Sequence, residues 1–144
     1  MPTLLVATHN AHKTGEFRAM LSDFFDDVAD LTTLLDMEEP EENGSTFAEN
    51  SAIKALAASN ALPDAFVIAD DSGLEVDALN GAPGIYSARY SGANATDATN
   101  RDKLMEELGK PEHEGKERSA RFRCVITVAR GGEVLAVFDG AVEG

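Results

Sequence analysis

The sequence contains a single cysteine, Cys124, no tryptophan and few aromatic residues. One cysteine cannot form an internal disulfide. Cys124 lies in an alternating, strand-like segment, where it is either a reactive thiol or a small buried core residue. The second interpretation is favoured, because free cysteines are usually buried and inert. With so few aromatic side chains, we expect a core built mainly from Ala, Val, Leu, Ile and Phe.

Basic charge is also scarce, since 12 Lys and Arg against 26 Asp and Glu give a formal net charge of −14. This argues against nonspecific binding to nucleic acid, which needs a basic surface. A free triphosphate is repelled too, so a phosphate site needs local lysines, arginines or a divalent metal. The chain lacks an apolar run long enough to span a bilayer, and its start lacks the pattern of a signal peptide. We therefore expect a cytoplasmic protein without a membrane partner.

The apolar content is nevertheless sufficient for folding, because 43% of the 144 residues are hydrophobic. This argues against disorder, and the length fits one domain over residues 1–144. Strands are predicted at residues 4–7, 28–31 and 66–69, and a late hairpin at residues 119–129 and 133–138. Helices are predicted after residue 10, at residues 46–61 behind a capping box, and at residues 96–108. Strands mixed with helices predict an α/β fold with a mixed sheet.

Helical spacing predicts which side chains of the first and third helices face the core. In the first helix these are Phe17, Met20, Leu21 and Phe24, and in the third they are Leu104, Met105 and Leu108.

The first candidate site is the segment between the first strand and the first helix. Free N–H groups at a helix N-terminus favour an anion, and Lys13 adds a full positive charge in the first turn. Asn10 either donates to a phosphate oxygen or holds the loop in its turn. The segment lacks the Walker pattern, and an ordinary helix start with an exposed lysine is the alternative. Its residues are Thr8, His9, Asn10, Ala11, His12 and Lys13.

Paired acids follow the strand at residues 66–69, a position where α/β sheets usually bind ligands. Asp70 and Asp71 point to opposite faces of an extended strand, so only one carboxylate need face a site. With Ser72 they could hold magnesium, which prefers carboxylates and phosphate oxygens; a solvated turn is the alternative. The acidic segment 38–44 could supply a second carboxylate or form solvated surface.

Two isolated cations are weaker candidates. Lys54 has apolar neighbours at helical spacing, so it either lies near the buried boundary of its helix or faces solvent. Arg89 lies among aromatic residues in a glycine-rich loop, which suits phosphate binding or base stacking without establishing either. The histidines show no metal-ligand spacing, and exposed loop histidine is the favoured interpretation for His9 and His12.

In their order and spacing, these segments resemble the inosine triphosphate pyrophosphatase family, also called dITP/XTP pyrophosphatases. The matching motifs occupy residues 8–13, 41–50, 52–55, 69–92 and 121–125, and so run through essentially the whole chain. One departure is His9, where the family usually has Gly. Family members also continue with a Gly-Phe-Gly-Tyr-Asp-type segment and a Ser-His-Arg segment that help bind the purine and phosphates. The domain is therefore expected to be C-terminally incomplete.

The resemblance implies an elongated mixed sheet flanked by helices, two lobes with a nucleotide cleft between them, and a homodimer. It implies Mg²⁺-dependent hydrolysis of ITP, dITP and XTP to the monophosphate and pyrophosphate. Glu41 and Asp71 would hold the metal, and Asp71 would act as, or orient, the general base. The substrate-binding residues would be Thr8, His9, Asn10, Ala11, His12, Lys13, Lys54, Ser72 and Arg89.

Three alternatives remain open at this point. The first is a catalytically inactive nucleotide-binding or dimerising fragment. The second is a related pyrophosphatase that acts on pyrimidine or modified nucleotides. The third is an acidic metal-binding module without a nucleotide role, which leaves the segments around Lys13 and Lys54 unexplained.

Overall fold

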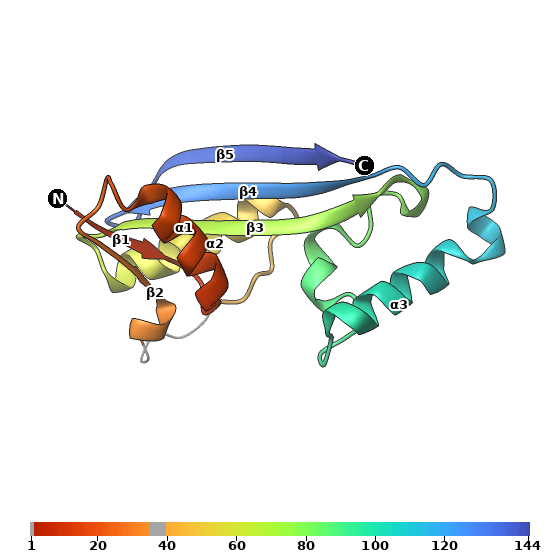
Figure 1. The fold of residues 1–144 in the computed structure, drawn as a ribbon, viewed down its shortest axis with the longest axis horizontal. Coiled ribbons are helices and arrows are strands. Elements are labelled where there is room, and N and C mark those ends of the chain that lie inside the picture. Colours follow the sequence, from red (N-terminus) through yellow and green to blue (C-terminus); the bar gives the residue numbers. More distant parts are fainter. Residues whose placement is uncertain (1, 35–39) are drawn as a thin grey trace. The chain divides into compact units, whose positions relative to one another are not determined.

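The computed structural model describes residues 2–34 and 40–144. Its strands form one five-stranded sheet in the order β2-β1-β3-β4-β5, with helices packed against it (Figure 1). The predicted α/β fold with a mixed sheet flanked by helices is confirmed. The elements are β1 (Thr3–Val6), α1 (Ala11–Leu21), β2 (Asp27–Asp30), α2 (Phe47–Ala61), β3 (Phe66–Val76), α3 (Asp97–Leu108), β4 (Ala120–Arg130) and β5 (Glu133–Glu143).

The sheet combines a parallel part with an antiparallel hairpin. β1 pairs in parallel with β2 on one side and with β3 on the other. β4 runs antiparallel to β3, because Arg130 lies over the Phe66 ring and the Ser119 carbonyl accepts from the backbone N–H of Asp77. Gly131 and Gly132 join β4 to β5, and both have positive φ angles, which favour glycine in a two-residue hairpin turn.

The chain divides into two compact units. One comprises residues 1–71 and 125–138, and the other comprises residues 72–124 and 139–144. β3, β4 and β5 each contribute residues to both units. The single domain over residues 1–144 and the cleft between two lobes stay predictions.

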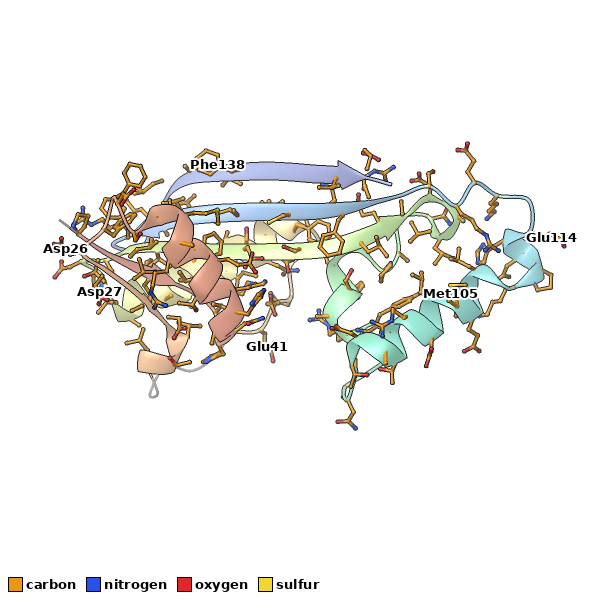
Figure 2. All side chains as sticks on the ribbon, viewed as in Figure 1. Asp26, Asp27, Glu41, Met105, Glu114 and Phe138 are labelled. Atoms are coloured by element: carbon orange, nitrogen blue, oxygen red, sulfur yellow. The ribbon has the colours of Figure 1, made fainter. Side chains whose placement is uncertain are left out.

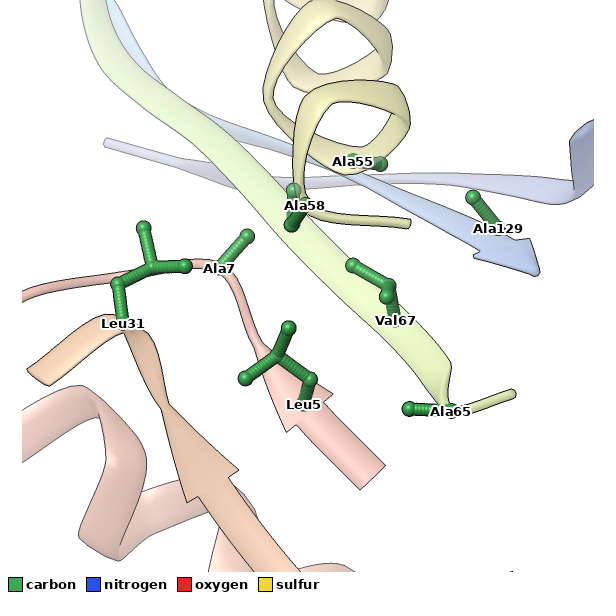
Figure 3. Packing of buried hydrophobic residues seen from close by; sticks show 9 residues of the cluster. Leu5, Ala7, Leu31, Ala55, Ala58, Ala65, Val67 and Ala129 are labelled. Atoms are coloured by element: carbon green, nitrogen blue, oxygen red, sulfur yellow. The ribbon is translucent and has the colours of Figure 1, made fainter. Parts of the chain in front are cut away.

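The first unit has one hydrophobic cluster between α2 and the sheet (Figure 3). Ala55 and Ala58 of α2 have no exposed surface, and their small side chains allow the helix to approach β1 and β3 closely. Two buried hydroxyl groups, on Ser51 and Thr127, lie 2.6 Å apart and link α2 to β4. The buried cluster consists of Leu5, Ala7, Leu31, Ala55, Ala58, Ala65, Val67, Ala69 and Ala129.

The other side chains of the same strands pack against α1. Leu4, Val6 and Ile68 are buried there, with Phe17 and Leu21 of α1 against them. The predicted inward positions of Met20 and Phe24 are wrong, because these side chains are 63% and 65% exposed. α1 ends at Leu21, so Phe24 lies in the turn that follows and is no longer on the helical face. Phe25 packs against the cluster instead.

The second unit has its own small core, in which Val76, Ala78, Leu79 and Leu108 are buried. Leu104 packs against this core as predicted, but the Met105 side chain (labelled in Figure 2) is 62% exposed. α3 has 12 residues and contacts the core along a narrow stripe of its surface. Leu104 and Leu108 are four residues apart and lie on that stripe, whereas Met105 is turned away from it.

The capping box predicted at the start of α2 forms only in part. Thr46 accepts from the backbone N–H of Glu49, as expected of an N-cap residue. The Glu49 carboxylate accepts from the backbone N–H of Ser45, and not from that of Thr46. Cys124 lies in β4 and is partly buried.

A buried carboxylate, Asp30, connects the end of β2 to α1. Its oxygens accept from the hydroxyl groups of Thr14 and Thr32 and from the Thr32 backbone N–H. Burial alone would raise the pKa of Asp30, but these hydrogen bonds, helped by the charge of Arg18, outweigh it and leave the pKa below its usual range. Asp30 therefore stabilises the fold as a charged group.

We predict that Thr14→Val destabilises the protein at pH 7 by about 1.5–3 kcal/mol, because a buried carboxylate loses a hydrogen bond. The lowered pKa of Asp30 gives stability that is present above the unfolded-state pKa and is lost as the pH falls through the folded-state pKa. The difference between the variant and the wild type should therefore shrink in acid. Urea unfolding at pH 7 and at pH 3 measures it, and an equal difference at both pH values would contradict this account.

Candidate functional site

The turn after β1 is built by its own polar side chains. The Thr8 hydroxyl accepts from the Asn10 backbone N–H at 3.0 Å, and Asn10 Oδ1 accepts from the N–H groups of His12 and Lys13 at 2.9 and 3.4 Å. Asn10 is thus the N-cap of α1 and holds the loop in its turn, which was one of the two predicted roles. Because its carbonyl oxygen already satisfies two of the helix N–H groups, an anion here must rely mainly on side chains.

Asp70 and Asp71 lie within β3, which continues beyond them to Val76. They follow the part of β3 that pairs with β1, residues 66–68, with Ala69 in between. The carboxylate of Asp70 is 2.8 Å from Nζ of Lys13, on α1. The two carboxylates point to opposite faces of the strand, as predicted, because Asp71 contacts residues of α2.

Asp71 lies among three polar side chains of the first unit. Asn50 hydrogen-bonds its carboxylate, while Lys54 and Glu42 act on it electrostatically. Its Oδ2 is buried and has no hydrogen-bond partner among the described residues. Burial is the main cause that raises the pKa of Asp71, and the positive charge of Lys54 opposes it. A buried, poorly satisfied carboxylate costs stability unless a ligand uses it.

Lys54 joins these groups into one cluster. Its ammonium group donates to the backbone carbonyl of Asp70 and lies 3.3 Å from Glu42 Oε1. The prediction that Lys54 lies near the buried boundary of its helix is confirmed, since its side chain is 23% exposed. The two lysines, Lys13 and Lys54, thus face three carboxylates. The formal net charge of these five groups is −1 when all are ionised. The carboxylates are those of Asp70, Asp71 and Glu42.

Glu42 was not predicted as a site residue, and neither was Asn50. Both belong to motifs that were noted in the sequence, but nothing in the pattern distinguished Glu42 from Glu41. Glu41 is exposed on the segment before α2 (Figure 2), whereas Glu42 is partly buried beside Lys54. The assignment of Glu41 as a metal ligand stays a prediction, and Glu38 and Glu39 lie outside the described residues.

A pocket of about 170 Å³ opens beside this cluster. The predicted residues Thr8, His9 and Lys54 contribute to its lining. The complete lining consists of Ala7, Thr8, His9, Leu31, Pro40, Glu42 and Lys54.

The remaining predicted residues lie outside that lining. Ala11 and His12 are exposed at the start of α1, where His12 lies 2.9 Å from Glu16. Ser72 follows Asp71 in β3 and is partly buried. Arg89 belongs to the second unit, is exposed, and lies with its guanidinium carbon 5.3 Å from the centroid of the Tyr86 ring.

The donor set fits a hard divalent cation. Among the described residues no group of three His, Cys, Asp or Glu side chains could enclose a metal ion. Magnesium does not require such a group, because it usually keeps several waters and binds one or two carboxylates together with substrate phosphates. The buried Oδ2 of Asp71 and the nearby Glu42 provide carboxylates of this kind.

Comparison with known proteins identifies the family. The model of the Ham1 family matches residues 4–144. The chain belongs to the Ham1 family. It is 46% identical to a dITP/XTP pyrophosphatase of Desulfotalea psychrophila over 144 residues, which cover 100% of this chain and 62% of that protein.

Solved structures of Ham1 proteins confirm the fold. The Staphylococcus aureus Ham1 protein has a TM-score of 0.85 and 43% identity, over 99% of this chain and 70% of that one. A HAM1 protein from Coxiella burnetii has a TM-score of 0.87 and 37% identity, over 100% of this chain and 72% of that one. This Ham1-family chain therefore spans between about three fifths and three quarters of the length of these relatives. No described helix has the length and apolar character needed to cross a membrane.

We predict that Asp71→Asn raises the free energy of unfolding at pH 7 by roughly 1 kcal/mol, because an amide removes a buried, poorly satisfied charge. At this chain length such a gain corresponds to about 3 °C in Tm. Thermal unfolding followed by circular dichroism measures it, with Asp102→Asn, on the exposed side of α3, as the matched control. A Tm below that of the wild type would contradict the proposed cost of the Asp71 carboxylate.

Proposed function

We propose that this protein hydrolyses deaminated purine nucleoside triphosphates, namely ITP, dITP and XTP, to the monophosphate and pyrophosphate with Mg²⁺. The observation that carries the proposal is the buried Oδ2 of Asp71, which lacks a hydrogen-bond partner among the described residues and lies close to Lys54 and Glu42. Membership of a family whose relatives are named dITP/XTP pyrophosphatases supplies the substrate class.

The metal requirement follows from the charge of the site. Lys13 and Lys54 each already pair with a carboxylate, so they cannot by themselves neutralise a triphosphate. Bound Mg²⁺ would supply Lewis acidity and charge neutralisation at the phosphate oxygens. Asp71 and one glutamate of the segment before α2 would hold it. Glu42 is the better placed of the two, because it already lies beside Lys54 and acts electrostatically on Asp71.

Different side chains of the protein would then carry different parts of the hydrolysis. In the proposed step the oxygen of a water molecule forms a bond to the α-phosphorus, and the bond to the bridging oxygen of pyrophosphate breaks with its electron pair. Asp71 accepts or directs the water proton, and its raised pKa favours such a role. Lys13 and Lys54 would exchange their carboxylate partners for phosphate oxygens. Thr8, His9 and Asn10 would shape the loop around the triphosphate.

Further features of the proposal come from the family resemblance. Arg89 and Ser72 would contact the nucleotide, His12 and Ala11 would lie along the triphosphate loop, and two copies would form a homodimer in the cytoplasm. Pyrimidine specificity, the inactive fragment and the metal-binding module are the alternatives that the experiments below distinguish.

We expect ITP and XTP to yield monophosphate and pyrophosphate only when Mg²⁺ is present, and ATP and GTP to react much more slowly. Phosphorus NMR resolves these products in a single assay of these four purine nucleotides together with CTP and UTP, with and without the metal. Release of inorganic phosphate in place of pyrophosphate would contradict the proposed cleavage at the α-phosphorus. Nucleotide binding without turnover would support the inactive fragment, and preference for CTP or UTP would support pyrimidine specificity. Neither binding nor turnover of any nucleotide would support the metal-binding module.

We expect Asp71→Asn to lower turnover of ITP by about 100-fold or more, because a positioned carboxylate that handles the water proton contributes at least that much. Glu133→Gln, which changes an exposed carboxylate on β5, is the matched control and should leave turnover unchanged. Near-normal turnover by the Asp71 variant would rule out its catalytic role.

The two glutamates before α2 are separated by a pair of matched variants. We expect Glu42→Gln to raise the Mg²⁺ concentration that gives half-maximal turnover roughly 10-fold, as loss of a ligand to a two-carboxylate site should. Glu41→Gln should change it less than twofold, because Glu41 is exposed. The reverse order of effects would assign the metal to Glu41, as the family resemblance implies.

A further inference from the structure

Asn50 connects the two segments that carry the carboxylates of the site. It lies near the start of α2 and is only 1% exposed. Its Oδ1 accepts from the backbone N–H of Gly44 at 2.8 Å, and its side chain also hydrogen-bonds the carboxylate of Asp71. Because Oδ1 is the acceptor for Gly44, the amide N–H is the donor to Asp71. One side chain thus holds β3 and the segment that contains Glu42.

The segment before α2 approaches Asn50 so closely that only glycine fits. A Cβ atom on Gly44 would lie 2.7 Å from Asn50 Oδ1 and 2.7 Å from Glu49 Cβ. Ordinary Cβ contacts are longer than this, so a side chain at position 44 would push the segment away from α2. The glycine therefore allows the hydrogen bond that fixes the position of the segment.

The helix does not need the Asn50 side chain for its own stability. Thr46 caps α2 by accepting from the Glu49 N–H, and the Asn50 backbone N–H makes the regular helical bond to the Thr46 carbonyl. A buried amide costs free energy unless both its ends are hydrogen-bonded. Here one end is used by Gly44 and the other by Asp71, and both partners belong to the site.

We infer that Asn50 is a positioning residue, which sets the separation between the Asp71 carboxylate and the carboxylate of the segment before α2 for a divalent cation. The inference rests on the proposed function, since it assigns a role within the same site. Oδ2 of Asp71 would be left for the metal, because this buried oxygen has no hydrogen-bond partner among the described residues. Residues that orient metal ligands typically change metal affinity 10–100-fold when they are replaced.

The test is Mn²⁺ binding to the full chain without nucleotide, with free Mn²⁺ measured by electron paramagnetic resonance. We expect Asn50→Ala to raise the Kd for Mn²⁺ about 10–100-fold. Ser51→Ala is the matched control, because Ser51 is equally buried in α2 but contacts Thr127 and not Asp71. It should destabilise the fold while changing the Kd less than twofold.

Gly44→Ala gives the same test without altering Asn50, and it replaces Asn50→Ala if that variant does not fold. Its Cβ should push the segment off Asn50 and also raise the Kd for Mn²⁺. In turnover of ITP, either variant should need more Mg²⁺ for half-maximal rate and should regain much of the rate at high Mg²⁺. A purely structural defect would lower the rate at every Mg²⁺ concentration.

The outcomes separate this inference from the proposed function. Asp71→Asn is measured in parallel, and an unchanged Kd for Mn²⁺ in that variant would mean that the proposed metal site itself is wrong. If Asp71→Asn abolishes binding while Asn50→Ala and Gly44→Ala bind as tightly as the wild type, the site stands and the positioning role of Asn50 is refuted.

Discussion

The site depends on one unfavourable interaction, which is the burial of the Asp71 carboxylate with an oxygen that lacks a hydrogen-bond partner among the described residues. Leaving a buried acceptor unsatisfied costs about 1–3 kcal/mol, and more when the group is charged. The fold holds it there because the residues before it are fully packed, with Val67 and Ala69 of β3 buried against α2. A stable core therefore places the carboxylate where a cation can use it.

The same constraint organises the charges around it. Lys13 of α1 donates to the side chain of Asp70, and Lys54 of α2 donates to its backbone carbonyl. Lys54 also pairs with Glu42 and acts electrostatically on Asp71. Because three carboxylates face two lysines, the site holds a slight excess of negative charge when all of them are ionised. Such a site attracts a divalent cation first and a polyanion only together with it.

Features that depend on neighbouring residues in the chain could be predicted from the sequence. Features that depend on contacts between distant segments could not. The strands before Thr8 and Asp70, the N-cap Thr46 and the hairpin at Gly131-Gly132 follow from local chemistry. Met20, Phe24 and Met105 were placed in the core wrongly, because the ends and narrow contact stripes of their helices depend on what packs against them. Glu42 and Asn50 were missed for the same reason: their roles arise where α2, β3 and the preceding segment meet.

Carbon NMR of the protein with ¹³C-labelled aspartate carboxyl groups, titrated with Mg²⁺, tests whether Asp71 binds the metal. The Asp71 resonance is assigned by its absence from the Asp71→Asn spectrum. We expect this resonance to shift with added Mg²⁺ in a saturable manner, while the resonances of exposed aspartates such as Asp102 stay in place. An Asp71 resonance that does not respond, or that moves only together with those of all exposed aspartates, would contradict a metal site at Asp71.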